Sequence, residues 1–245
     1  MAYLSRIDLN PLRRGAQNLI LNPQAMHAAV LGGLPPGVNG RVLWREDRSA
    51  STGGAPRSSV IVLTPEEPDW SHLVEQAGWG TAQGAPLIRD LQPLLDLVVT
   101  GRRFGFRLRA NPTESTKTPA TPTAIQRGRQ DRGERRGVRV AHRTAGHQLD
   151  WFLKRTTTNE AAWGFTVQQE PLPEVQLVER DVLRFRKGRD VSHNVTLARA
   201  TFEGVLTVTD SQRLRGLLLA GIGRGKAYGC GLLTLAPEKA DVVVG

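Results

Sequence analysis

The chain contains a single cysteine, few aromatic residues and no long apolar run, and each shortage excludes a class of protein. Cys230 alone can form neither an intramolecular disulfide nor a cysteine-rich zinc site. Aromatic residues make up 5% of the chain, so we do not expect base stacking to dominate binding to a nucleic acid. No apolar run approaches the ~20 residues that span a bilayer, and the N-terminus lacks a long apolar signal core. We therefore expect a cytoplasmic protein without a membrane partner.

Motifs for metals and nucleotides are missing as well. The histidines include no pair with H-E-x-x-H spacing, and we expect neither a metal nor a cofactor. The run GIGRGKAYGCG near the C-terminus suggests a phosphate-binding loop, but Ala220 and Ala227 stand where a Walker loop needs its first glycine and its final serine or threonine. Its G-x-G-x-G spacing also differs from the G-x-G-x-x-G of dinucleotide-binding proteins. We therefore do not expect an enzyme that uses ATP or NAD.

The chain does have a large excess of positive charge. Its formal net charge is +10, which attracts polyanions and above all nucleic acid. A solvated basic surface without a ligand is the alternative. Seven arginines lie between Arg127 and Arg143, opposed by Asp131 and Glu134. We expect part of residues 111–146 to be mobile, or ordered only by RNA.

The glycine-rich segment carries two candidate phosphate contacts, Arg224 and Lys226. Glycine permits positive φ and a close approach of the backbone to a partner. Backbone N–H groups beside cations suit a phosphate-bearing ligand, and an RNA backbone fits best. The alternative is a tight turn that binds nothing. The glycines concerned are Gly221, Gly223, Gly225, Gly229 and Gly231.

The order of predicted elements indicates the fold. It reads β-α-β-β-α and then β-α-β-β-α-β, the split βαβ pattern twice over. We therefore predict an α+β protein of two tandem ferredoxin-like (RRM-like) domains with antiparallel sheets, whose faces opposite the helices are free to bind. Domain bounds of 1–100 and 101–237 are expected, with a flexible tail at 238–245. The expected strands are Tyr3–Leu9, 41–45, 58–63, 104–110, 163–168, 175–187, 194–208 and 228–235, and the expected helices are 23–31, 87–99, 148–155 and 214–220.

His27 is the residue best placed to do chemistry. Asn22 and Pro23 form a helix start, because Asn is a good N-cap and Pro is tolerated at the first helical position. Met26 and Val30 mark the buried stripe of that helix, and His27 is rotated about 100° from Met26, at the border of the stripe. A border histidine can reach a ligand. A lone histidine is more often structural or solvated, which is the alternative.

Two further sets of cations are candidate RNA contacts. Phe104 to Ala110 alternates apolar and other residues, which predicts a strand whose outer face carries Arg107 and Arg109. Leu183 and Phe185 are expected to face the core. The cations beside them would then crowd the exposed side of a hairpin with its tip near Gly188. A solvated charged hairpin is the alternative. The four cations are Arg184, Arg186, Lys187 and Arg189.

An ordered set of short motifs resembles the CasE family of CRISPR-associated endoribonucleases, the RNA-processing subunit of type I-E Cascade. A strand ending in D-L-N-P precedes a helix with N-P-x-x-M-H. F-R-L-R-A-N-P and F-E-G follow, at 106–112 and 202–204, and the chain closes on G-I-G-R-G-K-A-Y-G-C-G-L-L. Each motif is weak, but their order is specific, and the likeness extends from residue 3 to Pro237.

The resemblance implies a fold and an activity. Family members have two tandem ferredoxin-like domains and cut precursor CRISPR RNA at the base of the repeat hairpin. They need no metal, leave a 2′,3′-cyclic phosphate and hold the hairpin product beside other Cascade subunits. The family's histidine falls on His27, as acid or base, and the basic pair of its RNA-binding hairpin falls on Arg186 and Lys187.

One departure from the family lies beside His27. Some relatives carry a tyrosine two residues after the asparagine that opens the helix, whereas this chain has Gln24. Gln24 can hydrogen-bond to a phosphate but cannot act as an acid or base, which leaves the second catalytic group open. A catalytically weak or inactive subunit that binds the RNA hairpin on the same scaffold is therefore the second hypothesis. An unrelated basic ferredoxin-like module, such as an oligomeric scaffold, is the third.

Overall fold

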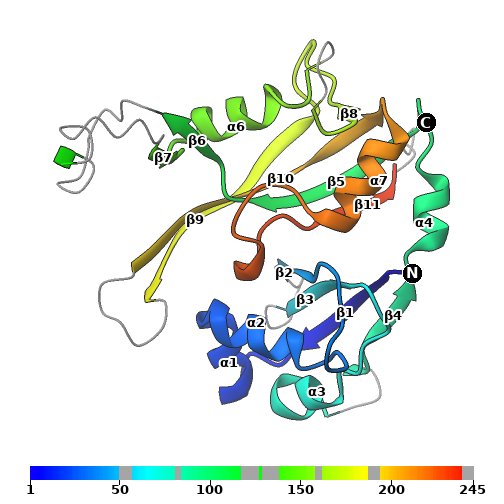
Figure 1. Cartoon of the computed structure of the whole chain (residues 1–245), viewed down its shortest axis with the longest axis vertical. Helices are drawn as coiled ribbons and strands as arrows, with labels where there is room; N and C mark the ends of the chain where they lie inside the picture. The colour runs from blue at the N-terminus through cyan, green and yellow to red at the C-terminus, as the bar shows by residue number, and fades with distance from the viewer. Residues whose placement is uncertain are drawn as a thin grey trace, which may run out of the picture.

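Two antiparallel sheets, each covered on one face by helices, form the body of the molecule (Figure 1). The structure is a computed structural model that describes residues 1–49, 57–80, 84–116, 127–128, 138–157, 162–186 and 194–238. We call residues 3–90 the N-terminal unit and residues 103–237 the C-terminal unit. Each unit contains one of the two sheets.

The N-terminal unit has the ferredoxin-like topology predicted from the sequence. Its strand order is β2-β3-β1-β4, and all pairs are antiparallel. The first strand and the helix with His27 lie where they were predicted. The elements are β1 (Tyr3–Leu9), α1 (Arg14–Leu21), α2 (Pro23–Leu31), β2 (Leu43–Ser49), β3 (Arg57–Thr64), α3 (Ser71–Ala77) and β4 (Leu87–Asp90).

The helix predicted over 87–99 is wrong in its first half. Leu87–Asp90 form strand β4, which pairs with β1. A helix, α4 (Gln92–Leu97), begins only afterwards, where the Asp90 carboxylate accepts a hydrogen bond from the Gln92 N–H at 2.9 Å. Pro93 fits this arrangement because proline is tolerated in a first helical turn and not in a helix interior. The helix between β3 and β4 is α3, which was not predicted from the sequence, and neither was α1.

The C-terminal unit repeats the topology. Its sheet has the order β11-β5-β10, and both β9 and β8 pair with the far side of β10. The predicted last strand begins later than expected, at Leu233, because Gly229 and Gly231 have positive φ and interrupt any strand there. The elements are β5 (Arg103–Ala110), α6 (Ala145–Leu153), β8 (Phe165–Thr166), β9 (Val175–Arg186), β10 (Asn194–Val208), α7 (Ser211–Ala220), the 3-10 turn η2 (Lys226–Tyr228) and β11 (Leu233–Pro237).

Residues 111–146 contain a short hairpin of β6 (Thr113–Thr116) and β7 (Val138–Ala141). The predicted mobility of this segment concerns residues that lie for the most part outside the described ranges. The predicted tail at 238–245 does so as well, except for Glu238, whose carboxylate pairs with Arg103 at 2.9 Å. The domain bounds of 1–100 and 101–237 stay a prediction.

The two units pack closely on one another. One apolar cluster lies between the N-terminal sheet and its helices, and a second joins the C-terminal sheet to α6 and α7. The second cluster also includes Leu43 and Leu63 of the N-terminal sheet, with Leu4 and Ile61 packed against it. The expectation that both sheets leave a free face is therefore wrong in part for the N-terminal sheet, since the C-terminal unit covers the part of that face around Leu43 and Leu63.

Candidate functional site

Helix α2 carries His27 and is built as its sequence indicates. The Asn22 side chain accepts hydrogen bonds from the N–H groups of Gln24 and Ala25, at 3.0 and 3.1 Å, and caps the helix. Met26 and Val30 are buried, and His27 is half-buried, as its position at the border of the apolar stripe predicts.

Burial shapes the chemistry of His27. Desolvation lowers the pKa of the imidazole below its ordinary value of 6.5, because the charged form loses hydration. Nδ1 is buried and has no hydrogen-bond partner among the described residues. The ring of the RNA-free protein is therefore mainly neutral at pH 7. Nε2 is the nitrogen left to exchange a proton with a ligand.

The glycine-rich loop, Gly221–Gly231, needs its glycines for structural reasons. All five have φ between 73° and 91°, a region that other residues enter at a cost. A Cβ at Gly221 would lie 2.8 Å from the Leu43 side chain, and one at Gly229 would lie 2.8 Å from Trp44. At these two positions glycine lets the loop pack against β2. Around Gly223, by contrast, there is open space.

The loop also places its turn η2, which carries Lys226, beside the helix of His27. Its turn η2 packs against both α2 and β2, and Figure 1 shows the loop extending from the C-terminal sheet toward the N-terminal unit. Arg224 is exposed and makes no hydrogen bond or ion pair with a described residue. The Lys226 ammonium donates to the Ala220 carbonyl at 2.6 Å. Burial, and then the charge of Arg41, lower the pKa of Lys226, which identifies Arg41 as a nearby cation that the sequence reasoning missed.

Strand β9 packs against the same loop through an aromatic pair. The Phe185 ring meets the Tyr228 ring of η2 edge-on, with centroids 4.7 Å apart. Phe185 thus faces the glycine-rich loop instead of the central core. Arg184, its neighbour on β9, is exposed as predicted. Lys187, Arg189 and the side chain of Arg186 lie outside the described residues.

The predicted basic outer face of β5 is wrong. Arg109 is only 2% exposed, forms an ion pair with Glu179 and donates from Nε to the Thr201 hydroxyl at 3.1 Å. Arg107 is partly exposed and pairs with Glu203 at 2.9 Å. Alternation along β5 predicts the strand but cannot show that β9 and β10 supply carboxylates opposite these cations.

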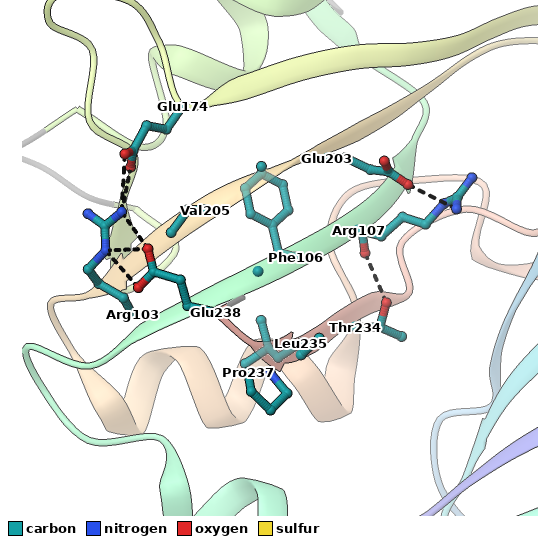
Figure 2. A pocket seen from close by; sticks show the side chains of 13 residues that line it. Arg103, Phe106, Arg107, Glu174, Glu203, Val205, Thr234, Leu235, Pro237 and Glu238 are labelled. Carbon is teal, nitrogen blue, oxygen red and sulfur yellow. Dashed lines mark hydrogen bonds and ion pairs between the residues drawn. The ribbon is translucent and has the colours of Figure 1, made fainter. Parts of the chain in front are cut away.

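A groove of about 660 Å³ crosses β11, β5 and β10 on the face of the C-terminal sheet that carries Arg103 and Arg107. Figure 2 shows Arg103 at one end of the groove, paired with both Glu174 and Glu238, and Arg107 at the other end, paired with Glu203. Both cations of the groove are therefore neutralised by carboxylates, and the groove is not a basic site for phosphates.

Within the described ranges there is neither a metal-binding cluster nor a membrane-spanning helix. No group of three or more His, Cys, Asp or Glu side chains is arranged to hold a metal ion. Among the same residues, no helix combines the length and the apolar character needed to cross a bilayer.

The fold and the site define the class of the chain. It is an α+β protein of two tandem ferredoxin-like units, in which a histidine-bearing helix packs against a glycine-rich basic loop. Its family follows from comparison with known proteins. A family model described as CRISPR associated protein matches residues 2–237. The chain belongs to this family of CRISPR-associated proteins.

Individual relatives agree with this assignment. The chain is 33% identical to the CRISPR-associated endoribonuclease Cse3 of Thermus thermophilus, over 96% of this chain and 100% of that protein. It is 33% identical to the CRISPR system Cascade subunit CasE of Escherichia coli, over 62% of this chain and 67% of the relative. A solved structure of Thermus thermophilus Cse3 bound to an RNA representing a pre-cleavage complex matches with a TM-score of 0.70, at 29% identity, over 96% of this chain and 99% of that one.

Proposed function

We propose that this chain is the endoribonuclease that cleaves precursor CRISPR RNA at the base of the repeat hairpin and retains the hairpin within Cascade. One observation carries the proposal: a half-buried histidine lies on a helix that the glycine-rich basic loop packs against, in a chain that is similar along its whole length to a CRISPR-associated endoribonuclease. The precursor RNA and the other Cascade subunits are its partners, and the cytoplasm is its location.

In the proposed reaction the RNA supplies its own nucleophile. The 2′-hydroxyl next to the scissile phosphate loses its proton to solvent, its oxygen attacks phosphorus, and the bond from phosphorus to the 5′-oxygen breaks. The products are a 2′,3′-cyclic phosphate and a 5′-hydroxyl, so no water molecule is consumed in the step. Holding the attacking and leaving oxygens in line can contribute up to ~7–11 kcal/mol.

His27 transfers a proton in this step, which is worth about 10²–10⁴-fold in rate. We propose that it acts as the general acid and gives a proton to the leaving 5′-oxygen. The ring is mainly neutral in the free protein because burial lowers its pKa. An approaching phosphate favours the protonated ring, because opposite charges at short range stabilise one another. RNA binding thus prepares the acid.

The remaining groups bind the RNA. Arg224 and Arg184 are exposed cations near η2 and at β9, and Lys226 lies on η2 itself. Cations there attract the phosphates and stabilise the charge that develops in the transition state. Gln24 hydrogen-bonds to a phosphate, and the hairpin cations Arg186, Lys187 and Arg189 contact the stem. Arg107 and Arg109 have no part in this proposal, because each forms an ion pair with a carboxylate of the protein.

The proposal is tested by incubating wild type and His27→Ala with the repeat hairpin in EDTA. A matched RNA carries one 2′-deoxy substitution at the cleavage position. We expect wild type alone to cleave, and only the unsubstituted RNA, with a cyclic phosphate on the product. Cleavage of the 2′-deoxy RNA, or undiminished cleavage by His27→Ala, would contradict the mechanism.

The second candidate function, an RNA-holding subunit with little or no catalysis, is favoured by one residue. Gln24 stands where some relatives have a tyrosine, and it cannot transfer a proton. Tight, salt-sensitive binding of the hairpin with no cleavage by wild type would decide for this function. Gln24→Tyr would then be the first variant to assay for restored cleavage.

A further inference from the structure

Arg45 is a charged residue buried where the two units meet. It lies on β2, the edge strand of the N-terminal sheet, yet it is only 2% exposed. Its guanidinium makes five hydrogen bonds, which matches the five N–H donors of an arginine. The acceptors are Asp47 Oδ1 at 2.6 Å, Asp47 Oδ2 at 2.9 Å, the Arg107 carbonyl at 2.9 Å, the Leu232 carbonyl at 3.0 Å and Thr234 Oγ1 at 2.9 Å.

Three of these five bonds cross from the N-terminal to the C-terminal unit. Two of the acceptors, Arg107 and Leu232, are backbone carbonyls on β5 and just before β11, so rotation of a side chain cannot move them. On the other side, Asp47 accepts two bonds in the bidentate arrangement that fixes the plane of a guanidinium. The side chain is therefore held from both units at once.

The neighbours of Arg45 show what this contact controls. Three consecutive residues of β2 meet the glycine-rich loop or its end. Leu43 packs at Gly221, Trp44 packs at Gly229, and Arg45 bonds to the carbonyl of Leu232. The same loop packs through η2 against α2, the helix that carries His27. A shift of one unit relative to the other would therefore move the loop relative to His27.

We propose that Arg45 is a positioning residue for RNA cleavage: by joining the two units it fixes the glycine-rich loop and its cations relative to His27. The inference rests on the proposed function, because it assigns to this contact an effect on the cleavage rate. Arg45 does not touch the RNA, since it is buried. A displacement of about 1 Å far from the reacting atoms can slow an enzyme about 100-fold.

Lysine cannot replace arginine in this role. An ammonium has three donors on one nitrogen, whereas the guanidinium spreads five donors over a rigid plane. Arg45→Lys keeps the charge beside Asp47 but cannot reach the four different groups that Arg45 joins. The conservative variant thus separates the geometry of the contact from its charge.

The test compares Arg45→Met, Arg45→Lys and a matched control in the full-length chain. The control is Arg6→Met, because Arg6 forms the same type of pair, two residues apart on one strand, with Asp8 at 2.9 Å. Arg6 is 46% exposed and its pair lies within the N-terminal unit. Thr234→Val, which removes one of the five acceptors, is a milder variant that serves if Arg45→Met does not fold.

Two quantities are measured for each variant. The first is the single-turnover rate of hairpin cleavage at saturating protein. The second is the distribution of distances between spin labels on the two units, at Leu21→Cys on α1 and Leu219→Cys on α7, both of which are exposed. Cys230 is fully buried and burial raises its pKa to about 11, so it stays unlabelled.

We expect Arg45→Met and Arg45→Lys to broaden the distance distribution and to slow cleavage at least about tenfold. Thr234→Val should give a smaller change in the same direction, and Arg6→Met should match wild type. A wild-type distance distribution, or a wild-type cleavage rate, in the Arg45 variants would overturn the inference. If wild type itself cleaves nothing, the proposed function fails, and the distance distribution alone decides whether Arg45 joins the units.

Discussion

At the scale of single residues, the burial of His27 determines how its activity depends on pH. Desolvation places its pKa below 6.5 in the free protein, and rates at subsaturating RNA report the free enzyme. A general acid must be protonated, so we expect this rate to fall as the pH rises through a pKa below 6.5. Cleavage measured from about pH 5 to pH 8, on both sides of the ordinary histidine pKa, checks this. His27→Ala should lack this dependence, and a rate that rises with pH through the same pKa would assign the base role.

Two arginines that look equivalent in the sequence should behave oppositely when removed. Arg224 is exposed and makes no bond to a described residue, whereas Arg109 is buried against Glu179. We expect Arg224→Ala to weaken hairpin binding, to lower the salt slope by about 1 and to leave stability unchanged. Arg109→Ala should lower the free energy of unfolding by about 1–3 kcal/mol, because it leaves a partly buried carboxylate unpaired.

Hairpin titrations at several salt concentrations and urea unfolding measure the two effects. A loss of stability in Arg224→Ala, or unchanged stability in Arg109→Ala, would contradict this division. The sequence predicted both residues as RNA contacts because the carboxylate that pairs with Arg109 is Glu179 of β9, 70 residues further along the chain.

At the scale of elements, the glycine-rich loop allows a comparison between two of its own residues. Gly223 and Gly229 have similar φ, 73° and 77°, but only Gly229 lies against a side chain, that of Trp44. Alanine at either position costs about 1–2 kcal/mol for its backbone conformation. Gly229→Ala should cost a further 1–3 kcal/mol or so from overpacking. Urea unfolding of the two variants measures the difference, and equal losses would contradict the packing role of Gly229.

The elements that the sequence predicted well are those with local signals. Strand Tyr3–Leu9 and helix Pro23–Leu31 were predicted with their observed bounds, since alternation marks the one and an N-cap marks the other. Strand β4 was mistaken for helix because its conformation depends on pairing with β1, which lies at the other end of the unit. The half-buried place of His27 was predictable for the same local reason, whereas its proximity to η2 depends on how the units pack.

At the scale of the whole molecule, shared apolar packing should make the two units unfold together. Leu43 and Leu63 of the N-terminal sheet belong to the cluster that also contains the core of the C-terminal unit. We expect one cooperative transition, with coincident curves from tryptophan fluorescence and far-ultraviolet circular dichroism. Two separated transitions would mean that the units are stable independently and that this packing contributes little.

The packing of the two units on one another could not be predicted from the sequence. The segment LWRED of β2 reads as a half-exposed edge strand, yet Leu43, Trp44, Arg45 and Glu46 are all at most 5% exposed. The sequence of β2 does not indicate that both faces of the strand are covered, because its charged residues are of the kind that usually contact solvent. Arg45 donates to groups of the other unit, such as the Leu232 carbonyl, whereas Glu46 accepts hydrogen bonds from Arg48 and Ser58 of its own unit.

The hydrogen bonds of Arg45 have a consequence for protein engineering and for recombination between relatives. Two domains of one fold in tandem invite the construction of chimaeras joined in the linker near residue 100. Such an exchange would separate Arg45 from the carbonyls of Arg107 and Leu232 that it was matched to. The elements that have to be exchanged together are therefore defined by contacts in space, and they comprise β2, β5, the glycine-rich loop and β11.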